Sequence, residues 1–349
     1  MVIKMKIKNL IFLLVFVLIA FSSCKSSEDT APVTDMGVGQ ETEAESMHTE
    51  AESMYTEPPA QEMEEKPSEG QHSIVGNVSA SGRCFYGAAG NNADTFTGLT
   101  PLEKVIFQDI EIRSTDTLST EMISHSYGVA VDEKPHTIST ENQKFFDEKL
   151  FDAVCLDTKT EEKVLYLTFD CGYENGYTSK ILDVLKEKQV TAAFFCTLPQ
   201  IKDNAELIAR MINEGHIVGN HSVTHPDFST LSVSEIVDEI KGFDDYLREK
   251  FGYSSLYFRF PQGKYSEKAM AVINDLGYKC VFWSLAYADW DTENQKGAMY
   301  AYETVLSRIH PGSVMLLHSV SSDNALALSD IIDTALERGY VFRSLEDMS

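Results

Sequence analysis

Apolar and polar positions alternate regularly only in the second half of the chain, from residue 163 onward. Apolar runs rich in β-branched and aromatic residues predict strands at 163–169, 190–196, 216–220, 256–259, 279–284, 313–317 and 340–343. Between them, helical periodicity predicts helices at 179–187, 205–214, 233–251, 267–276, 300–309 and 325–338. Helix ends carry the expected signals, because Gly215, Gly252, Gly277 and Gly339 follow helices and Ser232 with Glu235 forms a capping box.

Strands that are apolar throughout and separated by helices indicate parallel pairing with both faces of the sheet covered. About seven such units predict an α/β fold, either a doubly wound sheet or a barrel related to the (β/α)₈ type. In both architectures, reactive groups lie at the carboxyl ends of the strands.

The first 24 residues predict an export signal. Lys4, Lys6 and Lys8 precede the apolar run 10–21, and Ser22-Ser23-Cys24 supplies small residues for cleavage. The segment ending at Cys24 is similar to a bacterial lipobox, although Phe21 replaces the usual Leu. We therefore expect a lipoprotein on the outer face of the cytoplasmic membrane. A plain cleaved signal, giving a secreted protein, and an uncleaved anchor are the alternatives.

Residues 25–70 hold 13 acidic and 2 basic side chains, with no sustained apolar period. Such a segment cannot offset its ordering entropy by burial, so we expect a disordered acidic tether. Residues 71–162 are less informative, with frequent Gly, Asn, Ser and Thr and a short amphipathic helix predicted at 142–150. We expect this region to be an arm that packs on the following domain, 163–349.

The 349 residues include 54 acidic and 29 basic side chains, for a formal net charge of −25. This charge excludes nucleic-acid binding, because a polyphosphate would be repelled.

Polar groups follow five of the predicted strands: Asp170, His221 with His225, Arg259, Asp289 beside Trp290, and His318. Each has an ordinary explanation as a turn residue, a core histidine or a structural ion pair. The two histidines, four residues apart, would share one side of a helical turn and bind a divalent metal there. A metal, a base and an acid around one pocket are what amide or ester hydrolysis requires.

The motifs Thr-Phe-Asp-x-Gly, His-Ser-x-x-His, Arg-x-Pro-x-Gly, Asp-Trp and Leu-Leu-His follow one another in this order. This series resembles the polysaccharide deacetylase (NodB-homology) domain, carbohydrate esterase family 4, over residues 163–347. The segments 171–178, 282–290, 294–297 and 318–324 look closest to its muramic-δ-lactam peptidoglycan de-N-acetylase subgroup, and Ser126-Tyr127-Gly128 resembles the Ser-Trp-Gly of that subgroup. The resemblance implies a distorted barrel with fewer than eight strands.

The resemblance also implies roles for these residues. Asp170 would be the base, His318 the acid, and His221 and His225 metal ligands. Arg259 would pair with Asp170, and Asp289 would keep His318 charged. The remaining implied contacts are the backbone N–H of Gln262 at the oxyanion, with Trp290 and Leu316 lining the acetyl pocket.

The sequence departs from the family at Cys171, where the third metal ligand is usually Asp and the subgroup often has Asn. Either the Cys171 thiolate completes a Cys/His/His site, or Cys171 is a small residue beside a two-histidine site. The expected cofactor is one divalent ion, zinc first, with cobalt, manganese or magnesium as alternatives.

We therefore expect a monomeric, metal-dependent N-deacetylase of cell-wall glycan that releases acetate, most of all from N-acetylmuramic acid. The alternatives are a deacetylase of chitin oligomers, xylan or an exopolysaccharide, and a non-catalytic glycan-binding lipoprotein. The presence of both a candidate acid and a candidate base argues against a protein that only binds glycan.

Overall fold

The computed structural model describes residues 78–90, 94–106, 115–160 and 162–348. The predicted signal, Cys24 and the acidic tether lie outside these residues. The described residues belong to one compact unit, Pro67–Ser349. Among them, no helix is both long and apolar enough to cross a membrane.

A curled sheet of eight strands forms the centre of this unit. Its strand order is β11 (Ser313–His318), β4 (Val164–Cys171), β5 (Ala193–Cys196), β6 (Ile217–Asn220), β8 (Tyr257–Phe258), β10 (Lys279–Val281) and β3 (Ala153–Val154), and β12 (Val341–Phe342) pairs with the start of β4. Every pair in this sheet is parallel. The predicted parallel α/β barrel is confirmed, with β3 as a strand that the sequence pattern did not indicate.

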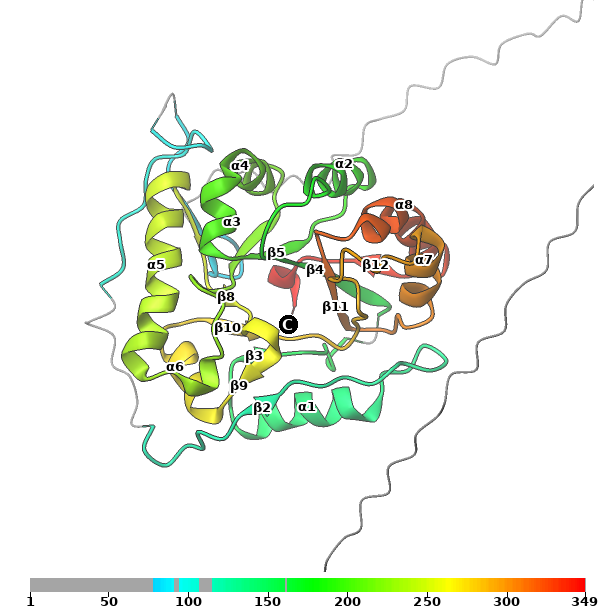
Figure 1. Ribbon diagram of the computed structural model, residues 1–349, viewed down its shortest axis with the longest axis horizontal. Helices are drawn as coiled ribbons and strands as arrows, with labels where there is room; N and C mark the ends of the chain where they lie inside the picture. Colours follow the sequence, from blue (N-terminus) through cyan, green and yellow to red (C-terminus); the bar gives the residue numbers. More distant parts are fainter. Residues whose placement is uncertain (1–77, 91–93, 107–114, 161, 349) are drawn as a thin grey trace, which may run out of the picture. The chain divides into compact units, whose positions relative to one another are not determined.

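The two ends of the sheet approach each other. Leu156 forms an isolated bridge with Ser313, and the N–H of Leu316 donates to the carbonyl of Leu285 at 2.8 Å. Helices surround the strands on the outside (Figure 1). They are α2 (Thr178–Lys188), α3 (Leu198–Asp203), α4 (Ala205–Asn213), α5 (Val233–Phe251), α6 (Glu267–Asp275), α7 (Ala298–Leu306) and α8 (Ser322–Glu337), with 3₁₀ turns η2 (Phe228–Thr230), η3 (Pro261–Gly263) and η4 (Leu345–Asp347).

Local sequence explains the best-defined elements. All eight residues of β4 are buried, as expected for a central strand covered on both faces. Helix α5 begins at the Ser232–Glu235 capping box and ends at Gly252, whose φ of 61° is a left-handed conformation that glycine adopts without strain. Its bounds match the prediction.

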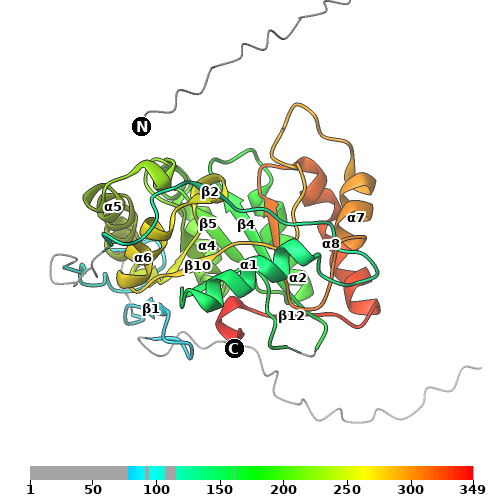
Figure 2. The ribbon, with the colours of Figure 1, turned by 90° about the horizontal axis from the view of Figure 1, so that it is seen from below.

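The predicted arm is built into the barrel. Strand β1 (Cys84–Tyr86) pairs antiparallel with β7 (Tyr253–Ser255), and β2 (Ile123–Ser124) pairs antiparallel with β9 (Lys264–Tyr265). Figure 2 shows β2 and α1 (Thr137–Glu148) crossing the same side of the barrel. Since β3 follows α1 and pairs with β10, the arm also contributes a strand of the main sheet.

Candidate active site

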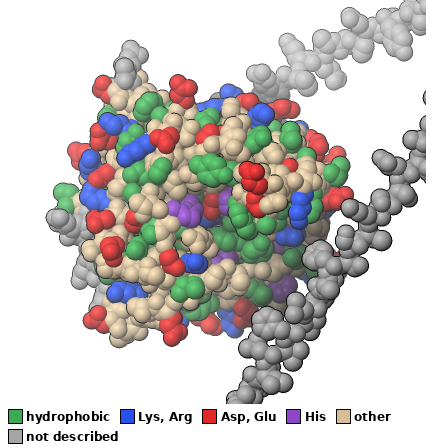
Figure 3. Space-filling view, viewed as in Figure 1, with side chains coloured by type: hydrophobic (Ala, Val, Ile, Leu, Met, Phe, Trp, Pro, Cys, Tyr) green, Lys and Arg blue, Asp and Glu red, His purple; other side chains and the backbone are tan. Residues whose placement is uncertain are grey.

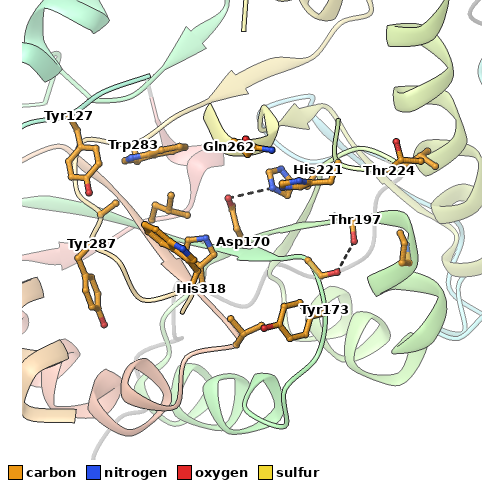
Figure 4. Close-up of a pocket in the computed structure, with 18 residues that line it drawn as sticks. Tyr127, Asp170, Tyr173, Thr197, His221, Thr224, Gln262, Trp283, Tyr287 and His318 are labelled. Carbon is orange, nitrogen blue, oxygen red and sulfur yellow. Dashed lines mark hydrogen bonds and ion pairs between the residues drawn. The ribbon is translucent and has the colours of Figure 1, made fainter. Parts of the chain in front are cut away.

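A pocket of about 770 Å³ opens at the carboxyl ends of the parallel strands. Figure 3 shows the hollow, with histidine side chains inside it. The predicted site residues that line it are Asp170, His221, His225, Gln262, Trp290, Leu316 and His318. Two further predicted residues, Arg259 and Asp289, are buried and bond to Asp170 and His318 (Figure 4 shows the lining residues). The structure thus brings nine predicted residues together.

Asp170, in β4, is held by a fully buried guanidinium. Nη1 of Arg259 donates to Oδ1 of Asp170 at 2.7 Å. The same guanidinium donates to the Thr168 hydroxyl at 2.8 Å and, through Nε, to the Val281 carbonyl at 2.9 Å. Burial raises the pKa of Asp170, but the charge and hydrogen bond of Arg259, together with the nearby His221 and His318, outweigh that effect, and the pKa lies below its usual value. Asp170 is therefore ionised at neutral pH.

His318, at the end of β11, belongs to a second buried network. Its Nδ1 lies 2.7 Å from Oδ1 of Asp289, and its backbone N–H donates to Oδ2 of Asp289 at 2.8 Å. Asn324 donates to Oδ2 of Asp289 at 2.6 Å and accepts from the Tyr287 hydroxyl. Burial lowers the pKa of His318, but the charge and hydrogen bond of Asp289, together with the charge of Asp170, outweigh that effect, so the net pKa is above the usual value. The network favours a charged imidazole.

Sequence reasoning missed Asn324. It lies in the first turn of α8, where polar residues are ordinary, and it is six residues beyond the end of β11. Asn324 is 1% exposed. Its hydrogen bond to Oδ2 of Asp289 holds that carboxylate next to His318. We regard Asn324 as a positioning residue, because it acts on His318 only through Asp289.

His221 and His225 face the pocket with their ring centroids 4.9 Å apart. Since a carbonyl can only accept, Nδ1 of His221 donates to the Arg259 carbonyl at 2.8 Å, which leaves Nε2 as the lone-pair atom. That atom is 3.6 Å from Oδ2 of Asp170. Burial lowers the pKa of His221 to about 4, so its imidazole is neutral at neutral pH.

The predicted helical turn at the two histidines is wrong. Residues 221–225 form a loop in which Ser222 and His225 both have left-handed backbones, with φ of 75° and 59°. Side chains stabilise this conformation: the Ser222 hydroxyl accepts from the His225 N–H at 2.9 Å. Glu239 of α5 accepts from the N–H groups of Val223 and Thr224 at 2.9 and 2.8 Å. Hydrogen bonding, not helical periodicity, brings the two rings together.

The donor chemistry fits a divalent metal at the histidine pair. A neutral Nε2 and a carboxylate oxygen face each other, two lone-pair atoms that a cation between them would satisfy. The structure does not place Cys171 with them: it is fully buried in the core, its thiol contacts Cys196, and it does not line the pocket. Within the described part of the chain, no three His, Cys, Asp or Glu side chains cluster as a metal site. The hypothesis of a Cys171 thiolate ligand therefore does not fit this structure.

The pocket walls are largely apolar. Leu316 is 5% exposed at the base, whereas Trp290 is 56% exposed and stands at the mouth, its ring centroid 5.7 Å from that of His318. Gln262 lines the wall from η3 with a left-handed backbone, φ 56°. Two aromatic residues also line the pocket, Tyr127 and Trp283, which the sequence analysis placed in motifs without giving them a role in the site.

A family model described as polysaccharide deacetylase matches residues 157–281, which include Asp170, the His221–His225 pair and Arg259. The peptidoglycan-N-acetylmuramic acid deacetylase PdaA of Bacillus subtilis is 48% identical over 190 residues, which span 54% of this chain and 72% of that protein. The chain belongs to the polysaccharide deacetylase family. The predicted enzyme class, a hydrolase that removes acetyl groups from a polysaccharide, is confirmed.

A solved structure and a further member of the polysaccharide deacetylase family are also similar. The structure of Bacillus subtilis PdaA, a family 4 carbohydrate esterase, matches with a TM-score of 0.63 and 42% identity, covering 66% of this chain and 98% of that one. A chitooligosaccharide deacetylase of Sinorhizobium fredii is 32% identical over 195 residues, covering 52% of this chain and 89% of that protein.

Proposed function

We propose that this polysaccharide deacetylase removes the N-acetyl group of N-acetylmuramic acid in peptidoglycan, as in muramic δ-lactam formation, and releases acetate. The observation that carries the proposal is the pair of opposite charges at one pocket. Asp170 is kept ionised by Arg259, and His318 is kept charged by Asp289. One group is thus ready to accept a proton and the other to donate one.

In this mechanism, Asp170 takes a proton from the water that attacks the acetamide carbonyl. His318 gives a proton to the nitrogen as the C–N bond breaks, so that one water is consumed and acetate and an amine are formed. Gln262 offers its backbone N–H to the oxygen that gains negative charge. His221 and His225 would hold a divalent metal, which would supply Lewis acidity. Zinc is the first choice, and cobalt, manganese or magnesium are alternatives.

The choice of sugar rests on similarity. The relative named for N-acetylmuramic acid is 48% identical to this chain, and the one named for chitooligosaccharides is 32% identical. A deacetylase of chitin oligomers, xylan or an exopolysaccharide therefore remains the nearest alternative, followed by a glycan binder without catalysis.

The test is an enzymatic measurement of acetate release with zinc supplied. Four substrates are compared: peptidoglycan with its stem peptides, peptidoglycan without them, chitin oligomers and acetylxylan. We expect release from peptidoglycan above all. Asp170→Asn and His318→Gln should each lower kcat by about 10²–10⁴-fold, because each removes a proton-transfer group. Both variants should keep the far-UV circular dichroism of the wild type. Release from chitin oligomers or acetylxylan alone would show that the substrate is one of these glycans instead. No release from any glycan would favour a non-catalytic glycan-binding protein.

We also propose that the protein is exported and acts as a monomer held to the outer face of the cytoplasmic membrane by a lipid on Cys24. The lysine-flanked apolar run before Ser22-Ser23-Cys24 supports this proposal. Cells grown with radiolabelled palmitate should label the wild type and not Cys24→Ala. A wild-type protein that is exported without label would instead support the secreted form.

A further inference from the structure

The carboxylate that pairs with His318 is held from behind by two uncharged side chains. Asp289 is 2% exposed, and its Oδ1 lies 2.7 Å from Nδ1 of His318. Its Oδ2 accepts from the His318 backbone N–H at 2.8 Å and from Nδ2 of Asn324 at 2.6 Å. Behind Asn324 lies Tyr287, whose hydroxyl donates to Oδ1 of Asn324. The four residues therefore form one chain of hydrogen bonds that runs from Tyr287 to His318.

The surroundings of Asn324 leave its amide group one orientation. The Asp289 carboxylate and the His318 backbone carbonyl, which is 3.3 Å away, can only accept hydrogen bonds, so the amide nitrogen must face both of them. The amide oxygen then faces Tyr287, which can donate. Because Asn324 is 1% exposed, loss of this donor would leave the oxygen buried and without any other hydrogen bond to the described residues, which is costly.

Backbone contacts fix both segments that carry this chain of hydrogen bonds. Asn324 lies in the first turn of α8, where its N–H donates to the N-cap hydroxyl of Ser321 at 3.2 Å. Tyr287 lies in the segment after β10, where the neighbouring Ala286 carbonyl accepts from Nη1 of Arg308 at 2.7 Å. The two side chains therefore meet from backbone positions that other contacts hold in place.

Tyr287 also belongs to the wall of the pocket. It is 5% exposed and lines the pocket. Figure 4 shows its hydroxyl directed away from Asp170. Burial raises the pKa of the Tyr287 phenol, so the hydroxyl is protonated at neutral pH and can donate. The ring is thus available to the pocket, whereas the hydroxyl is used by Asn324.

We propose that Tyr287 is a positioning residue for the proton donor His318. Its hydroxyl holds the Asn324 amide in place, and that amide holds Asp289 against the imidazole. This inference rests on the proposed function, in which His318 protonates the leaving nitrogen. A reacting group that is misplaced by about 1 Å can slow a reaction by about 10²-fold, so a support two residues removed from the imidazole can still affect the rate.

The kinetic test is Tyr287→Phe, which removes the hydroxyl and keeps the ring. With soluble peptidoglycan fragments and zinc supplied, kcat for acetate release should fall about tenfold, because Asp289 loses support. KM should stay within about twofold of the wild type, because the pocket wall is unchanged. Asn324→Ala should lower kcat by a similar factor. Since Tyr287 acts through Asn324, the double variant should be no slower than Asn324→Ala.

Tyr300→Phe is the matched control. The Tyr300 ring centroid lies 6.2 Å from that of Tyr287, but the Tyr300 hydroxyl is 3.4 Å from Nζ of Lys296. The control therefore removes the same group from a neighbouring tyrosine that is outside the chain of hydrogen bonds. It should leave kcat and KM unchanged.

A second readout needs no turnover. The proton that His318 Nδ1 shares with Asp289 should give a far-downfield NMR signal in the full-length protein, and His318→Gln should lack it. In Tyr287→Phe this signal should broaden or vanish, because the loosened hydrogen bond exchanges its proton with water faster. Tyr300→Phe should retain the signal.

Three results would each overturn the positioning role. They are a downfield signal that is missing from the wild type or unchanged in Tyr287→Phe, a kcat that is unchanged in Tyr287→Phe, and additive losses of kcat in the double variant. If the wild type releases acetate from no glycan, the proposed function fails. The NMR comparison of Tyr287→Phe with Tyr300→Phe then decides the positioning role by itself.

Discussion

The pKa values of Asp170 and His318 are shifted so as to favour opposite charges at one pocket, and each side chain has one buried partner of opposite charge at hydrogen-bond distance. Nη1 of Arg259 is 2.7 Å from Asp170, and Oδ1 of Asp289 is 2.7 Å from Nδ1 of His318. Both partners are out of contact with solvent, so their effects are little screened by salt. The two pKa shifts have opposite directions, which widens the pH range over which both groups are in the active form.

Asp289→Asn tests this arrangement through pH dependence. His318 donates a proton only when charged, and its raised pKa depends on the Asp289 carboxylate. Without the Asp289 carboxylate, the effect of burial dominates and the pKa of His318 falls. The alkaline limb of the activity profile should therefore move to lower pH. At neutral pH, kcat should fall by about tenfold or more. The measurement is the pH profile of kcat/KM.

Asp291→Asn is the control, because Asp291 is exposed and accepts a hydrogen bond from the Glu293 N–H within its own loop. It should retain the wild-type profile. An alkaline limb that does not move in Asp289→Asn would contradict the role of Asp289.

Individual site residues were predictable where they follow a strand. Asp170, His221 and His318 each come at or directly after an apolar run, and the barrel geometry then brings them together. Asn324 and Tyr127 have no such signal, because one begins a helix and the other lies in an irregular segment. Cys171 was a plausible ligand because it stands where the family usually has its third metal ligand, and only the packed core shows its thiol against Cys196.

At the scale of elements, the loop at 221–225 departs most from its prediction. Four-residue spacing is helical in many sequences, but here two left-handed residues and one acceptor from α5 replace the helical hydrogen bonds. Glu239 therefore controls where His225 lies.

Glu239→Ala should weaken metal binding. Without its carboxylate, the N–H groups of Val223 and Thr224 lose their acceptor, and the loop that carries His225 is free to change conformation. Loss of such supporting contacts typically costs 10–100-fold in metal affinity, so we expect a change of about that size. Competition with a chromophoric zinc chelator measures it directly.

The neighbouring Asp238 is exposed, and Asp238→Ala removes the same charge from the same helix. Its zinc affinity should equal that of the wild type. If both variants bind zinc like the wild type, Glu239 does not position the loop.

Helices with clear end signals were predictable, and the short strands of the arm were not. Helix α5 has a capping box, a glycine end and a regular apolar stripe, and its bounds were right. Strands β1, β2 and β3 have three or two residues each, which is too few for any period to be seen. Their positions depend on partners that are distant in the sequence.

At the scale of the whole unit, the arm completes the barrel. Strand β3 extends the sheet beyond β10, and Phe146 of α1 is fully buried with its ring stacked 5.2 Å from that of Phe282. The residues before 163 therefore supply part of the core.

A chain that begins at residue 163 should not fold cooperatively. Loss of one buried Phe costs about 3–5 kcal/mol, and a domain is stable by only about 5–15 kcal/mol. The shortened chain would also lose β3 and the contacts of β1 and β2. Thermal unfolding followed by circular dichroism should show no sharp transition, whereas a chain that begins at residue 78 should unfold like the full protein. Similar midpoints for the two chains would contradict an integral arm.

The pairing of β3 with β10 also constrains the order of folding. β3 leaves the ribosome, or any export channel, long before its partner, and it cannot dock until β8 and β10 have formed. Such distant contacts are slow to form, because the loop must close before any contact is gained. During this interval Phe146 and the Cys155 thiol, both fully buried in the finished barrel, are exposed to solvent. The newly made chain is therefore most vulnerable to aggregation and thiol oxidation before its last third has emerged.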